Sequence, residues 1–381
     1  MATLLGDEIE KQTGTTVIRG LLDRPGALDV GDNHIIDRLL PDYSILDEVD
    51  YDYALRDAYI AYATRGCPNT CPFCAVGRLE PKFEHYLPLR HQVTAIEETF
   101  GPRQDLVLLD NNVLASNQFD RIVGDIIELG FYRGARIHGR QRRVDFNQGI
   151  DLRLLTPQKM TALAATAIKP LRLAFDDIKL KDLYVSRVEM AGAAGIQTLS
   201  NYVLYNYQDT PRDFYERLRL NVLLNQRLGM QIYSFPMKFI PLDAKDRSYV
   251  GPHWNRQMLR GVQCILLATK GMVGPKLDFF EAAFGSDYDE FVEITMMPDD
   301  YIIYREKYKN NGAAEWRRRF RALSGTERTE FVSILNSQDA KISADSREIS
   351  SALRELLAHY GTGRRPTAIE TQLQLTLAPT A

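Results

Sequence analysis

Between residues 58 and 239 the chain alternates short apolar runs with longer stretches in which apolar residues recur every third or fourth position. Short apolar runs bounded by Gly, Pro, Asn and Asp predict buried strands, and the longer periodic stretches predict amphipathic helices. The predicted strands cover residues 58–63, 106–109, 144–148, 171–175, 197–205 and 231–239.

Local signals mark where the helices between these strands begin and end. Thr156 and Thr210 each stand directly before a proline, which places a capping hydroxyl next to a proline at the first helical position. Gly195 is expected to end the helix that precedes it. The predicted helices cover residues 89–99, 117–129, 177–195 and 210–228, and another helix opens at residue 156.

Six strand–helix units in a row predict the α/β class, with a parallel sheet and helices outside it. Beyond about residue 245 the pattern becomes mainly helical, and residues 345–360 are predicted to form an amphipathic helix. The expected organisation is an acidic N-terminal lead-in (1–57), a strand–helix domain (58–245), a helical C-terminal region (246–361) and a polar tail (362–381).

Charge and composition narrow the class of protein. The first 57 residues hold 13 Asp and Glu against 5 Lys and Arg, so this segment either packs on the following domain or forms a partly mobile acidic arm. The 381 residues are 45% hydrophobic and 25% charged, with a formal net charge of −3, as in ordinary globular proteins. No apolar run approaches the roughly 18 residues of a membrane span, and no signal peptide is recognisable, so we expect a cytoplasmic protein without membrane contact.

Three of the four cysteines stand close together directly after the first predicted strand. Cys67, Cys71 and Cys74 follow one another in a stretch where Gly66 and Pro68 interrupt regular structure. We therefore expect three thiols on one loop at the carboxyl end of a strand. Clustered thiols in a long chain with a single other cysteine fit a reducing compartment.

Three thiolates without a fourth nearby suit an incomplete metal site. Structural zinc sites and closed iron–sulfur clusters both use four protein ligands. A loop with three can hold a [4Fe-4S] cluster that leaves one iron open to a substrate or cofactor. The alternatives are a zinc site completed by His85 or Cys264, and a disulfide with a spare thiol. Cys264 itself lies in an apolar helical stretch and is expected in the core.

The spacing Cys67-x3-Cys71-x2-Cys74, with Phe73 directly before the last cysteine, resembles that of the radical S-adenosylmethionine (radical SAM) superfamily. The resemblance covers about residues 55–245. Within the superfamily, the chain is distantly similar to methylthiotransferase and cobalamin-type barrels, but it lacks their extra domains. It implies a partial (β/α)6 TIM-type barrel, a [4Fe-4S] cluster on the three cysteines, and S-adenosyl-L-methionine at the open iron beside Phe73.

The same resemblance implies a reaction. One electron, from a reductant such as flavodoxin or ferredoxin, cleaves the cofactor to a 5′-deoxyadenosyl radical, which abstracts hydrogen from a substrate. The cofactor supplies the difficult chemistry and the protein orients and shields it. Neither the substrate nor the fate of the cofactor follows from the sequence.

Polar residues after the second and third predicted strands are candidate cofactor contacts, because sites in such folds lie at the carboxyl ends of strands. Asp110 and Asn111 stand where the superfamily has a Gly-Gly-Glu-like motif that contacts the methionine amino group, and only the Asp110 carboxylate keeps that character. A plain turn is the alternative for these two residues. Asn147 and Gln148 close the third strand and are expected to face the site.

Three charged residues complete the candidate cofactor contacts. Arg153 could fork onto the cofactor carboxylate, and the alternative is an ion pair with Asp151. Asp176 is assigned to the ribose hydroxyls and its neighbour Asp177 to the cap of the next helix. Asp209 stands where methylthiotransferases and cobalamin-dependent relatives have a Glu-Thr pair.

Two groups of arginines stand out from the mildly acidic whole, five between Arg133 and Arg143 and four in Arg317–Arg321. Arginine interleaved with aromatic residues can bind phosphates and stack on bases, so a nucleotide or nucleic acid is the first substrate class, before a peptide or a small metabolite. Solvated faces, or contacts with the acidic N-terminal segment, are the alternative. The competing function is a non-catalytic, zinc- or cluster-stabilised module that binds nucleic acid.

Overall fold

The computed structural model describes residues 2–28, 31, 33–337 and 349–360. The chain divides into two units, one of Met1–Asn255 with Thr269–Phe291 and one of Arg256–Ala268 with Val292–Ala381. The predicted tail and residues 345–348 of the last predicted helix lie outside the described residues. The division expected from the sequence stays a prediction.

Six parallel strands in the first unit follow one another in chain order, each within a few residues of its predicted range. One three-stranded sheet has the order β1-β2-β5 and the other β6-β7-β8. Two isolated parallel bridges, Val144 with Ile168 and Ile150 with Leu173, connect them. The strands are β1 (Ala58–Ala61), β2 (Asp105–Leu108), β5 (Val144–Phe146), β6 (Leu171–Ala174), β7 (Thr198–Tyr205) and β8 (Gln231–Lys238).

The α/β class with parallel strands is thereby confirmed. Within the part of the chain that the structure describes, no strand pairing joins β8 back to β1, so a closed barrel is not present. The curling of the six strands into one partial barrel is a finer statement, and it belongs to the functional proposal below.

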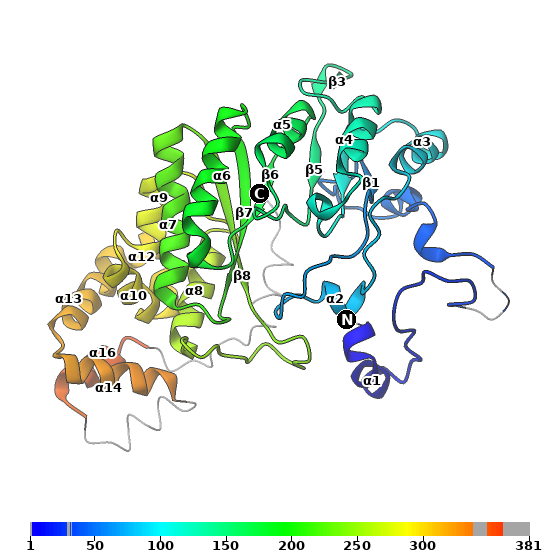
Figure 1. Cartoon of the computed structure of the whole chain (residues 1–381). Helices are drawn as coiled ribbons and strands as arrows, with labels where there is room; N and C mark the ends of the chain where they lie inside the picture. Colours follow the sequence, from blue (N-terminus) through cyan, green and yellow to red (C-terminus); the bar gives the residue numbers. More distant parts are fainter. Residues whose placement is uncertain (1, 29–30, 32, 338–348, 361–381) are drawn as a thin grey trace. The chain divides into compact units, whose positions relative to one another are not determined.

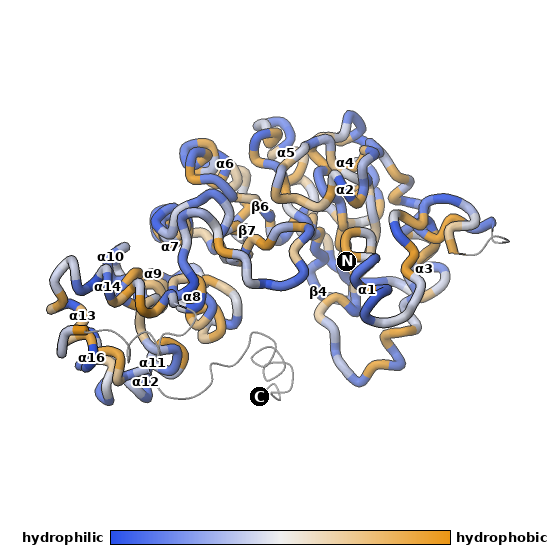
Figure 2. Tube along the Cα trace, turned by 90° about the horizontal axis from the view of Figure 1, so that it is seen from below, coloured by the Kyte–Doolittle hydropathy of each residue, from blue (hydrophilic) through white to orange (hydrophobic). Residues whose placement is uncertain are grey.

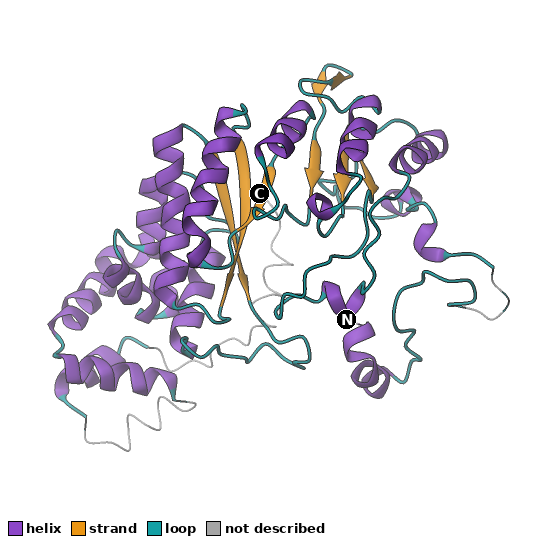
Figure 3. Ribbon diagram, viewed as in Figure 1, coloured by secondary structure: helices purple, strands orange, loops and turns teal. Residues whose placement is uncertain are grey.

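Helices connect the strands and lie along their outer side (Figures 1 and 3), as the sequence pattern predicts. In Figure 2 these helices carry both polar and apolar residues, as expected when one face covers a sheet. The first unit contains α1 (Ala2–Thr13), α2 (Val76–Leu79), α3 (Leu89–Phe100), α4 (Phe119–Glu128), α5 (Pro157–Ala165), α6 (Lys181–Ala193), α7 (Pro211–Leu228) and α9 (Leu277–Phe284). Shorter elements there are η1 (Ile36–Arg38), η2 (Tyr43–Asp47), η3 (Val113–Ala115), η4 (Ile178–Leu180) and the hairpin of β3 (Arg136–Ile137) and β4 (Arg140–Gln141).

The helix caps predicted at Thr156, Asp177 and Thr210 are confirmed, whereas α4 begins after Gln118 without a side-chain cap, so a cap from Asn117 is wrong. Thr210 and Asp213 form a reciprocal capping box at the start of α7, and Thr156 accepts a hydrogen bond from the Lys159 backbone N–H at 3.3 Å. Asp177 accepts from the Lys179 N–H at 2.9 Å and so caps η4, directly ahead of α6. Helix α6 ends at Ala193, two residues before the left-handed Gly195.

A buried cation ties the carboxyl ends of β6 and β7 to α7. The Arg217 guanidinium is inaccessible to solvent and donates to the carbonyl oxygens of Phe175 and Leu204, both at 2.8 Å. It also forms an ion pair with Asp209 at 2.9 Å. These contacts satisfy the Phe175 carbonyl, just past β6, and the Leu204 carbonyl, near the end of β7, and they fix the loops that follow both strands.

The second unit is helical in its described part. Its elements are α8 (Arg256–Ala268), α11 (Asp299–Ile303), α12 (Arg305–Tyr308), the π-helical turn η5 (Lys309–Ala313), α13 (Ala314–Ala322), α14 (Gly325–Asn336) and α16 (Ser351–Leu357), while α10 (Tyr288–Met296) crosses the boundary between the units. Cys264 is buried in α8, as expected for a small core residue. None of the helices described for this chain is both long enough and apolar enough to span a bilayer.

Replacing Arg217 by methionine should lower the free energy of unfolding by about 3–5 kcal/mol, because the buried Asp209 carboxylate loses its cation. Urea unfolding followed by circular dichroism measures the change. Arg227→Met on the same helix is the control, since the ion pair of Arg227 with Glu189 is half exposed and should contribute no more than about 1 kcal/mol. Equal losses in the two variants would contradict the structural role of Arg217.

Candidate functional site

The three clustered cysteines lie on the loop between β1 and α2, at the carboxyl end of β1. All three are free and partly exposed, and the Cys74 N–H donates to the Cys71 carbonyl at 3.0 Å. Among the described residues, no three His, Cys, Asp or Glu side chains are arranged as a finished metal-ion site. The structure thus gathers the thiols on one loop without forming a complete ligand set.

The start of this loop is held by Asp110, which lies just past the end of β2 and is buried. Its carboxylate accepts from the backbone N–H of Ala63 at 3.1 Å, from the N–H of Thr64, and from the Thr64 hydroxyl at 2.6 Å. Burial raises the pKa of Asp110 to about 6, although all these bonds oppose the shift. The carboxylate oxygens of Asp110, a predicted cofactor contact, therefore accept hydrogen bonds from Ala63 and Thr64 at the start of the loop.

A second carboxylate, that of Glu80, holds the loop just before the first cysteine. It accepts from the Gly66 N–H and from the Asn111 side-chain amide, both at 2.8 Å, and pairs with Arg65 at 3.2 Å. Gly66 has φ +72°, and a Cβ there would lie 2.4 Å from the Lys82 carbonyl oxygen, so only glycine fits. Asn111, like Asp110, thus supports the cysteine loop.

The loop after β5 contacts the cysteine loop through a pair of opposite charges. Arg153 forks onto Asp151 at 2.7 and 2.8 Å, the ion pair that the sequence offers as the alternative to a cofactor contact. Asp151 also accepts from the Asn69 side chain at 3.0 Å. Burial alone would raise the pKa of Asp151, but the bonds from Arg153 and Asn69 outweigh it and lower that pKa.

Arg153 also acts on a cysteine. Burial raises the pKa of the Cys71 thiol, while the nearby Arg153 guanidinium opposes that shift and Cys74 and Cys67 add to it. The three thiols and the guanidinium are therefore close enough to influence one another. A cation at this place favours the thiolate form of Cys71.

Asn112 is the side chain that reaches the first cysteine. It is 2% exposed, and its amide nitrogen lies 3.5 Å from the Cys67 sulfur. The side-chain carbonyl oxygen of Asn112 (Oδ1) is buried and has no hydrogen-bond partner among the described residues. A buried acceptor without a partner is costly unless a ligand or water satisfies it.

Aromatic contacts connect the cysteine loop to the far strands. The rings of Phe73 and Tyr207 meet edge to face at 5.6 Å between centroids, and Tyr207 contacts Phe239 at 4.7 Å. An ion pair of Arg78 with Asp243 at 2.8 Å adds a polar contact. Side chains that follow β2, β5, β7 and β8 therefore all reach the segment from the loop to α2.

The remaining predicted contacts have structural partners. Gln148 is exposed, its amide lies 3.3 Å from the Asn147 side-chain oxygen, and the Asn147 backbone carbonyl accepts from Tyr202. Asp176 accepts from the Leu204 N–H at 3.4 Å. Burial raises the pKa values of Asp176 and Asp209, and Arg217 opposes both shifts.

The first group of arginines is partly engaged within the protein. The Arg142 guanidinium lies 3.6 Å from the centre of the Phe131 ring, and Arg140 pairs with Asp57. Arg133 donates to the Ala194 carbonyl at 3.2 Å. Part of this group is thus committed to intramolecular contacts at the amino edge of the strands.

The second group is paired with carboxylates. Glu293, which is buried, pairs with Arg317 at 3.2 Å and Arg321 at 2.6 Å, and Arg319 pairs with Glu315 at 2.6 Å. Trp316 and Phe320 stack on each other in the core of the second unit and offer no face to a base. This arrangement does not support a nucleic-acid interface at Arg317–Arg321.

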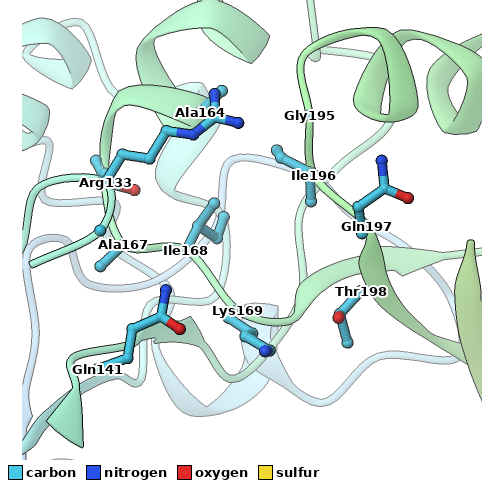
Figure 4. A pocket seen from close by; sticks show the side chains of 12 residues that line it. Arg133, Gln141, Ala164, Ala167, Ile168, Lys169, Gly195, Ile196, Gln197 and Thr198 are labelled. Atoms are coloured by element: carbon cyan, nitrogen blue, oxygen red, sulfur yellow. The ribbon is translucent and has the colours of Figure 1, made fainter.

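A pocket of about 180 Å³ lies elsewhere in the first unit (Figure 4). Residues that precede β6 and β7 line it, including Lys169 and Gln197, together with Arg133. Because parallel strands share one direction, this is the amino edge, opposite the cysteine loop. The pocket is lined by Arg133 of the first arginine group but by none of the predicted cluster or cofactor residues, so it is not the candidate site.

Sequence reasoning missed several side chains that hold the loop. Asn112 is the third polar residue after the strand and carries the same signal as Asp110 and Asn111, but it is not among the predicted contacts. Asn69 lies within the cysteine loop itself. Glu80 and Tyr207 carry no local signal, because only the three-dimensional arrangement brings them to the loop.

No protein-family model matches this chain, and no curated protein matches it. Among solved structures, the chain is similar to the crystal structure of Streptococcus suis SuiB bound to precursor peptide SuiA, with 13% sequence identity and a TM-score of 0.37. The match covers 66% of this chain and 47% of that chain, so this chain spans about half the length of SuiB.

The raised pKa of Asp110 predicts a pH dependence of stability. Because the folded value of about 6 lies above the ordinary value of 3.8, the folded chain takes up a proton between these pH values before the unfolded chain does. The wild type should therefore gain up to about 3 kcal/mol relative to Asp110→Asn as the pH falls through this window. Thermal unfolding of both proteins across the window measures it, and parallel curves would contradict the assignment.

Proposed function

We propose that this chain is a radical SAM enzyme, in which Cys67, Cys71 and Cys74 hold a [4Fe-4S] cluster and S-adenosyl-L-methionine binds beside it. In this proposal the six parallel strands curl into one partial barrel, with the site at their carboxyl ends. The bound cluster would supply the electron that cleaves the cofactor reductively, and the resulting radical would abstract hydrogen from the substrate.

The observation that carries the proposal is the support of the cysteine loop. Three thiols with the spacing of the superfamily lie on a loop that side chains after β2, β5 and β7 contact from different directions. A loop that served as a plain surface turn would not need a buried carboxylate, a forked arginine pair and an aromatic contact. A reactive site does need ligands held by supporting residues.

The residues present fit the group. Three free thiols with no disulfide partner supply the ligands that a cluster with one open iron requires. The unpaired, buried carbonyl oxygen of Asn112 beside Cys67 is an acceptor that a bound ligand could satisfy. Loading would require the three thiol side chains to converge from their present positions on the loop.

Each supporting residue has a distinct role in this proposal. Asp110 and Glu80 fix the backbone ahead of the first cysteine, and Asn111 orients Glu80. Arg153, held by Asp151, places positive charge beside Cys71. Phe73 packs edge to face on Tyr207 and so connects the cysteine loop to the segment after β7. Contacts of Asn147, Gln148, Asp176 and Asp209 with the cofactor stay predictions.

The paired arginines in the second unit weigh against the competing function, a zinc-stabilised module that binds nucleic acid. A phosphate would have to displace the carboxylates that already bind Arg317, Arg319 and Arg321. They equally weigh against nucleic acid as the first substrate class. Metal analysis separates the two functions, since the module would hold zinc and the enzyme iron and sulfide.

Replacing Cys71 by alanine should abolish cluster loading without unfolding the chain, because the variant keeps only two ligands on the loop. After anaerobic reconstitution with iron and sulfide, iron content and visible absorption measure the loading. After reduction and addition of S-adenosyl-L-methionine, 5′-deoxyadenosine in the wild type alone would establish the reaction class. Cys264→Ala, which removes a thiol buried in α8, is the control and should load normally. Normal iron content in Cys71→Ala would overturn the ligand assignment.

Replacing Asn112 by leucine should lower the reduction potential of the cluster, because a hydrogen bond to a ligand sulfur stabilises the more negative, reduced state. A redox titration followed by electron paramagnetic resonance measures the shift. Asn111→Ala is the matched control, since the amide of Asn111 contacts Glu80 and not a thiol. If the potential shifts equally in both variants, Asn112 does not act through Cys67.

A further inference from the structure

Exposed apolar side chains gather in one short stretch of the N-terminal segment. Of the large apolar side chains that are exposed in the described residues, nearly half lie between residues 39 and 55. We call this stretch the acidic–apolar segment. Its exposed apolar residues are Leu39, Ile45, Val49, Tyr51, Tyr53 and Leu55.

The acidic–apolar segment is anchored to the first unit at several points. The Tyr43 ring is buried, and its hydroxyl donates to the Ala58 carbonyl at 2.9 Å and accepts from the Ile60 N–H at 2.8 Å. Leu40 and Leu46 pack against the main core. The segment therefore has buried side chains that hold it beside β1, and exposed apolar side chains at neighbouring positions.

Contacts within the segment hold several of its exposed side chains in place. The rings of Tyr51 and Tyr53 contact each other edge to face with centroids 4.7 Å apart. Arg56 closes the end of the segment by pairing with Asp47 at 2.9 Å and Asp52 at 3.8 Å. Concentrated exposed apolar side chains on an anchored frame mark an interaction surface more often than an isolated exposed residue does.

The charge of the segment selects the partner. Residues 39–55 contain five carboxylates and no Lys, Arg or His. Arg56 pairs with two of them, Asp47 and Asp52, so the segment keeps a strongly negative charge with Arg56 included. Such a face repels the phosphates of nucleic acids, anionic lipid surfaces and small acidic proteins. A partner must offer positive charge beside apolar groups, and a basic polypeptide has both. Tyrosine is also among the residue types enriched at the positions that contribute most to binding in protein interfaces.

We propose that the acidic–apolar segment docks a basic, apolar-containing polypeptide segment of a partner. Its carboxylates attract the lysines or arginines of the partner, and Tyr51 and Tyr53 bury the apolar side chains between them. The segment precedes the amino end of β1, whereas the cysteine loop follows the carboxyl end. The docking surface is thus separate from the proposed catalytic site, and variants in it leave that site intact.

The test uses the full chain and a short fluorescent peptide of alternating lysine and leucine, followed by anisotropy. The wild type should bind it, more weakly as salt rises, and should not bind the same peptide with glutamate in place of lysine. Tyr51→Ser with Tyr53→Ser should weaken binding about tenfold or more. Tyr132→Ser with Tyr304→Ser, two tyrosines of similar exposure elsewhere, is the matched control and should change nothing.

Each other result overturns the proposal. Equal weakening by both pairs of substitutions would show that peptide binding is not specific to the segment. Binding of the glutamate peptide would remove the charge argument. Sedimentation velocity tests whether a second copy of this chain occupies the surface instead. A dimer that dissociates on substitution of Tyr51 and Tyr53 would show that the surface is a contact between copies. Iron content and 5′-deoxyadenosine formation are independent of all these outcomes, so failure here is distinguishable from failure of the proposed function.

Discussion

The buried carboxylate of Asp110 is the interaction on which the candidate site depends. When the chain leaves β1, the N–H groups of Ala63 and Thr64 lose the ladder that satisfied the strand, and a buried N–H without an acceptor is costly. Asp110 supplies that acceptor from the end of the neighbouring strand. The place where the cysteine loop begins is thereby tied to the pairing of β1 with β2.

The other contacts of the loop pair the carboxylates that lie near the three thiols. Three carboxylates lie around the loop, and they belong to Asp110, Glu80 and Asp151. Each of them accepts hydrogen bonds from the loop or pairs with Arg65 or Arg153. An unpaired carboxylate beside a cysteine would raise the pKa of the thiol and disfavour the thiolate, which is the form that binds metal. Arg153 does the opposite at Cys71. Burial still leaves the pKa of Cys71 raised, and Arg153 limits that rise, which favours the thiolate that the proposed ligand role of Cys71 requires.

The sequence predicted the strands and helices closely because their signals are local. Alternating runs, Thr–Pro helix starts and glycine stops depend on neighbouring residues, and all six strands formed near their predicted ranges. Site residues are a different problem. Asp110 was placed at the correct strand end, but its role depends on where the Thr64 hydroxyl lies, and no periodicity contains that information. Glu80 and Asn69 were missed because their partners, Asn111 and Asp151, are distant in the sequence.

Local composition also cannot show whether a charged side chain is already paired. Arg317–Arg321 resembles a nucleic-acid contact in the sequence because Trp316 precedes its arginines and Phe320 stands among them. Helical spacing, however, turns both rings into the core and brings Glu293 and Glu315 to the guanidinium groups. The acidic–apolar segment is the reverse case. Its sequence predicts only a lead-in, but Tyr43 and Leu46 face the core and their neighbours face solvent. Which side of a segment is anchored, more than its composition, decides what it can bind.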